Sequence, residues 1–274
     1  MSAAFPEIDA YIEDRAKLIG AKLEQYIALV REKHPTLSDA AAHALRNGKK
    51  IRPVLCVAAC EASGGNIKRA MPAACAVEMI HCYSLIHDDL PSMDDDDMRR
   101  GLPSVHKMFG EATAILAGDL LLTDSFGLLA VEGKSAGIED AKLIEIIKTV
   151  SDCAGKSGMA VGQMMDLESA DTADEKKTAE INSLKTGALI EAAVKCGAIA
   201  AGANEKQMAP LERYSKAVGL AFQTVDDALD SEGRGDAKEK ARALTSEAVG
   251  HLEDFSGDKN TLAGLALRLC ERAK

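Results

Sequence analysis

Apolar residues recur with helical spacing along nearly the whole chain. After Pro6 they fall on one repeating face of the first segment, at Ile8, Tyr11, Ile12, Leu18, Ile19, Leu23 and Ile27. Spacings of three and four residues are typical of an amphipathic helix, and proline is favoured in a helix's first turn. The same reasoning predicts helices over residues 51–62, 71–87, 111–131, 141–154, 158–167, 172–200, 206–230, 237–255 and 260–273. The pattern therefore predicts an all-α protein.

Breaks in this pattern mark where the predicted helices end. Pro35 interrupts the first helix, and Ser38-Asp39 has the character of the next N-cap. Gly64-Gly65 and Pro91 close two apolar helices. No Gly/Ser-rich, Pro-rich or highly charged linker divides the 274 residues. We therefore expect one domain over residues 1–274, a bundle of about ten or more helices.

Charge and cysteine content narrow the classes of function. The net charge of -10 and the pI of about 5.2 argue against nucleic acid or an anionic membrane as the main partner. The seven cysteines form no C-x-x-C pair, which favours free thiols in a reducing compartment. Neither a signal peptide nor an 18-residue uncharged apolar run is recognisable. These features predict a cytoplasmic protein without stable membrane insertion.

Two aspartate clusters are the most unusual feature of the chain. Six of the ten residues from Asp88 to Asp97 are aspartates, and a second group consists of Asp226, Asp227 and Asp230. On a helix, the spacing of the second group puts its carboxylates on one face. Like charges at this density repel one another unless cations lie among them. Because each cluster follows an apolar helix, a metal site is favoured over a solvated loop.

The first cluster has a geometry that suits a divalent ion. Asp88 ends a helix and Pro91 breaks it, so that Asp94 can return beside Asp88. Carboxylate oxygens suit Mg²⁺ better than zinc. We expect the two clusters to face one another across the bundle.

Basic residues provide the complement to such a metal site. Lys49 and Arg52 lie three apart at a predicted helix start, where phosphate oxygens are readily bound. Arg99 and Arg100 follow the first cluster, and Lys185 lies in an otherwise apolar helix. Together they are typical of diphosphate recognition.

The ordered motifs resemble those of the short-chain trans-isoprenyl diphosphate synthases, the farnesyl and geranylgeranyl type. The resemblance is strong over about residues 35–240. It rests on Gly48-Lys49-Lys50-Ile51-Arg52-Pro53, His81, the D-D-x-x-x-x-D motif followed by Arg99-Arg100-Gly101, Gly162-Gln163-Met164-Met165-Asp166-Leu167, Lys185-Thr186-Gly187, and D-D-x-x-D after Phe222-Gln223. It implies a helical bundle around a central cavity, and a homodimer with residues 111–131 as a candidate interface.

The resemblance also implies a role for each matching residue. Asp88 and Asp94 would bind two Mg²⁺ ions and Asp226 a third, with Asp227 and Asp230 assisting through water. Arg99, Lys185 and a lysine after the second motif would hold an allylic diphosphate, and isopentenyl diphosphate would be held by Lys49, Arg52, His81 and Arg100. Thr186, Gln223 and the carbonyl of Lys185 would face an allylic cation. By count that lysine is Lys240, with Lys238 as a rival, and the loop beyond it is shorter than in the family.

Product length depends on residues near the end of the helix that leads to Asp88. Ser84 is one turn, about 5–6 Å, before Asp88, and Tyr83 is next to it. In the family an aromatic residue five positions before this aspartate accompanies short products. We therefore expect Tyr83 to be the floor of the cavity and farnesyl diphosphate to be the product.

Other functions stay open at this point. A geranylgeranyl or geranyl diphosphate synthase is the nearest alternative, and a non-catalytic subunit of a heteromeric synthase is the main one from another class. A class I terpene cyclase would need a different second metal motif and more than 3% aromatic residues. A phosphohydrolase using His87-Asp88 would not explain the second cluster.

Overall fold

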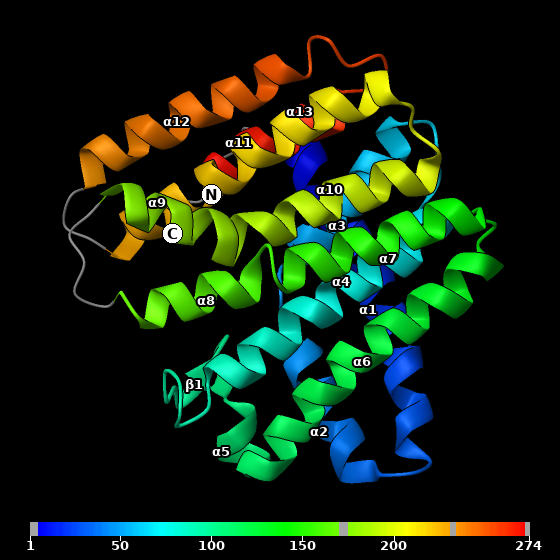
Figure 1. Ribbon diagram of the computed structural model, residues 1–274, viewed down its shortest axis with the longest axis vertical. Helices are drawn as coiled ribbons and strands as arrows, with labels where there is room; N and C mark the ends of the chain where they lie inside the picture. Colours follow the sequence, from blue (N-terminus) through cyan, green and yellow to red (C-terminus); the bar gives the residue numbers. More distant parts are fainter. Residues whose placement is uncertain (1–4, 170–174, 231–233, 272–274) are drawn as a thin grey trace.

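The chain folds mainly into helices, as its periodicity predicts (Figure 1). The structure is a computed structural model that describes residues 5–169, 175–230 and 234–271. Its first half comprises α1 (Pro6–Arg31), α2 (Pro35–Leu45), α3 (Ile51–Ala62), α4 (Ile67–Asp88), β1 (Met98–Arg99), β2 (Leu102–Pro103), α5 (Val105–Phe109) and α6 (Glu111–Ser135).

The second half continues the helical bundle. It comprises α7 (Asp140–Ala154), α8 (Met159–Leu167), α9 (Glu175–Asn182), the π-helical turn η1 (Ser183–Gly187), α10 (Ala188–Ala201), α11 (Glu205–Asp230), α12 (Arg234–His251) and α13 (Asn260–Cys270). In Figure 1 the end of α4 near β1, α8 and α9 lie at the same end of the bundle.

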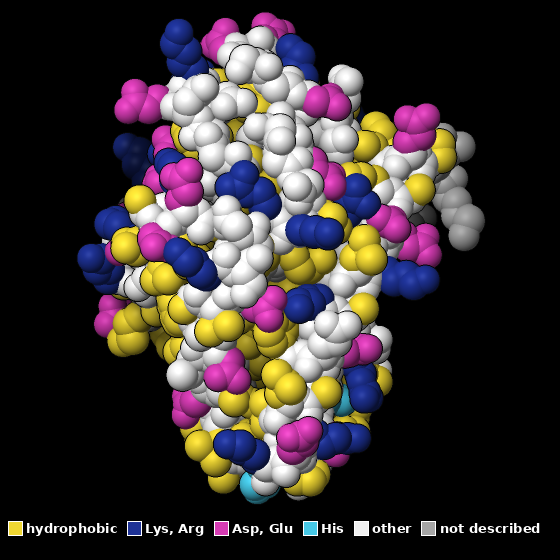
Figure 2. Space-filling view, turned by 90° about the vertical axis from the view of Figure 1, so that its right-hand side faces the viewer, with side chains coloured by type: hydrophobic (Ala, Val, Ile, Leu, Met, Phe, Trp, Pro, Cys, Tyr) yellow, Lys and Arg dark blue, Asp and Glu magenta, His cyan; other side chains and the backbone are white. Residues whose placement is uncertain are grey.

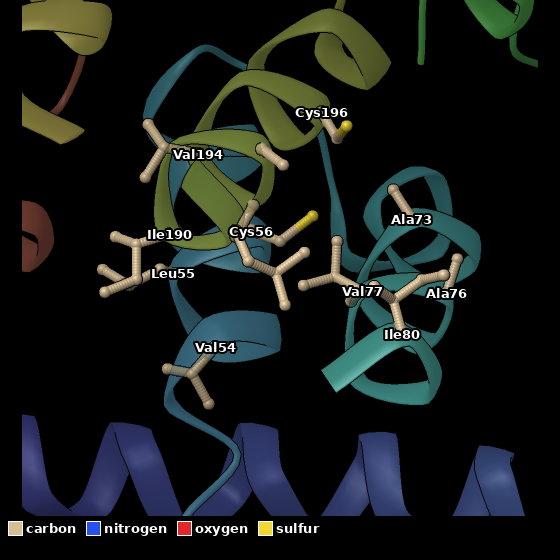
Figure 3. Packing of buried hydrophobic residues seen from close by; sticks show 14 of the residues in the cluster. Val54, Leu55, Cys56, Ala73, Ala76, Val77, Ile80, Ile190, Val194 and Cys196 are labelled. Atoms are coloured by element: carbon tan, nitrogen blue, oxygen red, sulfur yellow. The ribbon is translucent and has the colours of Figure 1, made fainter. Parts of the chain in front are cut away.

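The core lies where α3, α4 and α10 pack against one another. Figure 3 shows Leu55 of α3, Val77 and Ile80 of α4, and Ile190 and Val194 of α10 in this interface. All five side chains are fully buried. Each such aliphatic side chain contributes about 1.5–3 kcal/mol on burial. The hydrophobic effect thus fixes α4, the helix that ends at the first aspartate cluster.

Helix boundaries differ from the sequence predictions in several places, among them the start of α4 at Ile67 and the end of α12 at His251. Helix α2 begins at Pro35 and is capped by His34, whose Nδ1 accepts from the backbone N–H of Leu37 at 3.2 Å. The predicted cap at Ser38 is therefore wrong: Ser38 is buried inside the helix and donates to the carbonyl of Ile27. The single helix predicted over 172–200 is divided by η1, and α5 was not predicted.

A short β-hairpin follows the first aspartate cluster. Strands β1 and β2 pair antiparallel, with Arg99 opposite Leu102. The two turn residues, Arg100 and Gly101, have φ values of 53° and 77°, as a type I′ turn requires. Two residues per strand are too few for an alternating pattern to be visible in the sequence, which explains why the prediction missed this hairpin.

Helix α6 is the one described helix that is long and apolar enough to cross a membrane by length and composition. Core helices of soluble proteins pass the same test. Within the molecule α6 packs on α4, yet Ile115, Leu116 and Val131 remain exposed.

Candidate active site

The end of α4 brings the first aspartate cluster back on itself. Asp88 is the last residue of the helix, and the backbone N–H of Asp94 donates to the carbonyl of Asp88 at 2.9 Å. This hydrogen bond confirms that Asp94 returns to Asp88 once Pro91 has broken the helix. The two residues expected to share a metal therefore lie at adjoining positions of one loop.

Ion pairs divide the six aspartates of this loop into two kinds. Arg99 donates from Nε to Oδ1 of Asp89 and from Nη2 to Oδ2 of Asp96, each at 2.8 Å. Lys107 lies 2.7 Å from Asp97 and 3.8 Å from Asp95. In the described part of the chain, Asp88 and Asp94 form no ion pair. The carboxylates left without a protein cation are the two predicted metal ligands.

The pKa of Asp88 reflects this shortage of positive charge. Burial of the carboxyl, assisted by the neighbouring carboxylates of Asp94 and Asp89, raises the pKa of Asp88 from 3.8 to about 6. The positive charges of Lys185 and Arg99 oppose this rise in the pKa without cancelling it. A divalent ion beside Asp88 would favour its charged form and reverse the shift.

Replacing Asp88 by asparagine should stabilise the metal-free protein in a pH-dependent way. The folded protein binds a proton at Asp88 at about pH 6, whereas the unfolded chain binds it only near 3.8. Above pH 6 the charged carboxylate therefore disfavours the folded state. At pH 7.5, with a chelator present to keep the protein metal-free, we expect Asp88→Asn to raise the melting temperature by about 2–4 °C. This gain in melting temperature should vanish below pH 4, because the carboxyl of Asp88 is then protonated in both the folded and the unfolded wild-type protein. Calorimetry at both pH values measures it, and an equal gain at both would contradict the assignment.

The second cluster is placed only by its backbone. Asp226, Asp227 and Asp230 lie in the last turns of α11, and their side chains fall outside the described residues. Their metal-binding roles therefore stay predictions. Among the side chains that are described, no group of three or more His, Cys, Asp or Glu forms a ready metal site.

A basic cavity of about 380 Å³ brings the predicted isopentenyl diphosphate residues together. Its lining includes Lys49, Arg52, His81 and Arg100 from three separate segments, together with Phe222 of α11. The guanidinium of Arg52 lies 5.6 Å from the Phe222 ring. One further polar group, Arg100 Nη1, is buried without a hydrogen-bond partner among the described residues. Such a donor suits an anionic ligand.

His81 acts in this cavity as an acceptor between two arginines. Its Nε2 lies 3.3 Å from Nη1 of Arg52 and 3.2 Å from Nη2 of Arg100. A guanidinium can only donate, so Nε2 must accept and the imidazole is neutral. Burial, followed by the positive charges of Arg52 and Arg100, holds the pKa of His81 well below its usual 6.5. The sequence predicted that His81 contacts a diphosphate directly. The geometry adds that His81 orients the guanidinium groups of Arg52 and Arg100.

Removal of this acceptor should selectively weaken binding of isopentenyl diphosphate, the ligand that the motifs predict for this cavity. For His81→Leu we expect KM for isopentenyl diphosphate to rise about tenfold to hundredfold, with KM for the allylic diphosphate nearly unchanged. His81→Gln, which keeps an acceptor, should recover part of the loss. Because His81 stays neutral, the wild-type KM should show no break near pH 6.5. Equal effects of the two substitutions would contradict the acceptor role.

A second cavity, of about 300 Å³, adjoins the first and is more apolar. The two share Arg52 and His81 in their linings. The second also reaches Tyr83, Ser84, Leu85, His87, Asp88, Met93, Met159, Ala160, Gln163, Lys185 and Thr186. It thus joins the acidic end of α4 to a surface suited to hydrocarbon.

Both product-length candidates contact this apolar cavity. Tyr83 is half-buried, and its ring meets that of His87 edge-on at 5.8 Å between centroids. Ser84 donates to the carbonyl of His81 at 2.9 Å. Tyr83 is therefore held by packing at the wall of the cavity, one turn from Asp88.

The π-helical turn η1 places Lys185 and Thr186 in the same cavity. The Nζ of Lys185 donates to Oδ2 of Asp166 at 2.5 Å. Asp166 was not among the predicted site residues, although the Gly162–Leu167 motif contains it. Asp166 and Lys185 are 19 residues apart, so no local sequence spacing indicates that they form a pair. This explains why Asp166 was not predicted.

Several predicted residues lie outside both cavity linings as described: Gln223, Lys238, Lys240, Arg99 and Asp94. Gln223 is half-buried on α11, next to Phe222. Lys238 and Lys240 are exposed on α12. Arg99 is beside Asp88, but its guanidinium is held by Asp89 and Asp96. The roles predicted for these residues stay predictions.

Comparison with known proteins identifies the family. The model of the family described as polyprenyl synthetase matches residues 34–248. The chain belongs to the polyprenyl synthetase family. This finding confirms the resemblance seen in the motifs, and the helical bundle is the fold of its structural neighbours.

Relatives of known sequence and structure support the membership. Geranylgeranyl pyrophosphate synthase from Catharanthus roseus is 43% identical over 226 residues, covering 82% of this chain and 62% of that protein. A dimethylallyltranstransferase from Fischerella ambigua is 48% identical over 188 residues, covering 68% and 54%. This chain thus spans less than two thirds of those relatives. The crystal structure of a geranyltransferase from Legionella pneumophila has a TM-score of 0.90 and 33% identity, covering 97% and 98%.

Proposed function

We propose that this member of the polyprenyl synthetase family condenses isopentenyl diphosphate with an allylic diphosphate in a head-to-tail, 1′–4 reaction. The observation that carries the proposal is the pair of adjoining cavities. The basic one offers several cations for a diphosphate, and the apolar one joins Asp88 to a hydrocarbon surface. Their shared residues, Arg52 and His81, would bring the two substrates next to each other.

The chemistry follows from this arrangement. The C1–O bond of the allylic substrate breaks, and the electron pair leaves with the diphosphate. The double bond of isopentenyl diphosphate then forms a new bond to the resulting cation, and a proton leaves from the adjacent carbon to the released diphosphate. Lys185 would stabilise charge on the leaving group. Arg52 and Arg100 would hold the second diphosphate away from the reacting carbon, so that only its double bond is presented.

Asp88 and Asp94 fit a role in magnesium binding. Mg²⁺ keeps several water molecules and is commonly bound by one or two carboxylates together with substrate phosphates. Two adjoining carboxylates without a protein cation match that requirement better than a closed site would. When bound, the ions would neutralise the diphosphate as its charge develops. We propose three ions, with Asp226, Asp227 and Asp230 supplying the opposite side.

We propose farnesyl diphosphate as the product. The support is Tyr83 at the wall of the apolar cavity, one turn from Asp88. The relative from Catharanthus roseus is named a geranylgeranyl pyrophosphate synthase, so a twenty-carbon product is the principal alternative. The two products differ by one further condensation, which Tyr83 would block by filling the space that a longer tail needs.

Assembly and location are also proposals. Exposed Ile115, Leu116 and Val131 on α6, with Ile144 on α7, support a homodimer formed over this helix. Figure 2 shows hydrophobic side chains between charged ones on one side of the molecule. All seven cysteines are free thiols, which supports a reducing compartment such as the cytoplasm. The molar mass in solution tests the dimer.

One assay tests the proposed function directly. The purified protein is incubated with Mg²⁺, isopentenyl diphosphate and dimethylallyl, geranyl or farnesyl diphosphate in turn. The dephosphorylated products are then separated by chain length. We expect farnesol from the first two primers and no elongation of the third. Farnesyl elongation would favour the geranylgeranyl alternative, and lack of product with every primer would refute the enzymatic proposal.

A further inference from the structure

Gln163, a residue of the apolar cavity lining, has a buried polar atom that no described group explains. Its Oε1 is buried and accepts no hydrogen bond from any described group. The residue lines the cavity together with Asp88, Lys185 and Thr186. Buried carbonyl oxygens in folded proteins nearly always have a partner, so this one calls for a ligand or a charge.

The close packing of α8 on η1 explains why Gln163 is there. A Cβ atom added at Gly162 would lie 2.3 Å from the backbone N of Lys185 and 2.7 Å from its Cα. Only glycine lets α8 approach the backbone of the π-helical turn so closely. The next residue, Gln163, is thereby held against the segment that carries Lys185 and Thr186. Its position is fixed by backbone contact, independently of any ligand.

The surroundings restrict what Gln163 can interact with. Met159, Ala160 and Leu85 make much of the nearby lining apolar. The hydrocarbon part of an allylic substrate has no hydrogen-bond donor, so it offers the carbonyl nothing while the substrate is intact. Once the C1–O bond breaks, positive charge spreads over C1 and C3, and the negative end of an amide dipole attracts it. The dipole thus acts mainly in the transition state.

We propose that Gln163 is a further catalytic residue whose side-chain carbonyl stabilises the allylic cation. This inference rests on the proposed function. The electron pair of the C1–O bond leaves with the diphosphate, and Gln163 neither gains nor loses a proton. It acts by orientation of its dipole, which the glycine-mediated contact between α8 and η1 holds in place before reaction.

Gln163→Met tests the role because it keeps the length of the side chain and removes the dipole. We expect kcat to fall about tenfold to hundredfold, with both KM values and the melting temperature nearly unchanged. Gln163→Asn keeps an amide on a shorter side chain, so its kcat should lie between those of wild type and Gln163→Met. Met164→Leu, an exposed position on the same helix, is the matched control and should match wild type.

Binding of two substrate analogues separates this role from a structural one. One probe is an ammonium analogue of the allylic cation, added with inorganic pyrophosphate, and the other is an uncleavable allylic thiolodiphosphate. Calorimetry should show that Gln163→Met weakens the ammonium analogue by a factor close to its loss of kcat, and the thiolodiphosphate by less than about twofold. Equal weakening of both probes, or of neither, would overturn the proposal. If wild type itself makes no prenyl product, the proposed function fails instead.

Discussion

Replacing Asp88 by alanine is expected to reduce prenyl transfer by about a thousandfold or more at saturating Mg²⁺. Of the six aspartates in the first cluster, Asp88 and Asp94 alone lack an ion pair within the described residues. Removing one of the two proposed ligands would deprive the diphosphate of the metal ion that we expect to hold it. The rate should be measured as isopentenyl incorporation over a range of Mg²⁺ concentrations.

Asp97→Ala is the matched control for this prediction. Asp97 belongs to the same cluster but is exposed, and Lys107 holds the pKa of its carboxyl below the usual value. Its loss should change the rate by about twofold or less, because an exposed ion pair contributes little. Full activity of the Asp88 variant, or equal losses at both positions, would show that the ion-pair pattern does not mark the metal ligands.

Replacing Tyr83 by alanine is expected to lengthen the product by at least one isoprene unit. Tyr83 lies on the helical turn before Asp88, so its removal opens about 5–6 Å along the path of the tail. An added isoprene unit requires a space of about that length. Chromatography of the dephosphorylated products should show geranylgeraniol or longer alcohols, in place of the farnesol that we propose for wild type.

Tyr83→Phe controls for the hydroxyl and should keep the wild-type product length. The ring, which packs edge-on against His87, is the element that we propose to block the tail. The alanine variant should still start with the same primers, because Asp88 and the basic cavity are unchanged. An unaltered product distribution for Tyr83→Ala would show that another residue limits the tail.

The predicted and observed folds agree where periodicity is strong. The nearly uniform apolar runs of α3 and α4 required helices, and the structure buries them as predicted. The apolar stripe of α1 also forms a helix, but only Ile19, Leu23 and Ile27 are buried and Leu18 is exposed. The prediction failed at α2, where the N-cap is His34 and not Ser38. It also failed at η1, where a π-helical turn interrupts the single helix predicted over 172–200. Both features depend on which hydrogen-bond partner a few backbone groups have, and the hydrophobic pattern carries almost no information about that.

The sequence by itself determined that this is a helical member of its family, with Asp88 at a helix end, Asp94 within reach, and clustered cations for diphosphates. Hydrophobic period is enough for the helices and covalent spacing for the positions of Asp88 and Asp94, whereas the family and the role of the cations follow from the resemblance of the ordered motifs. Only the tertiary structure decided that Arg99 neutralises Asp89 and Asp96 and that His81 accepts from two arginines. It also decided that the buried carbonyl of Gln163 has no partner among the described residues. These features depend on contacts between residues distant in sequence, since helix packing sets which charges and dipoles meet.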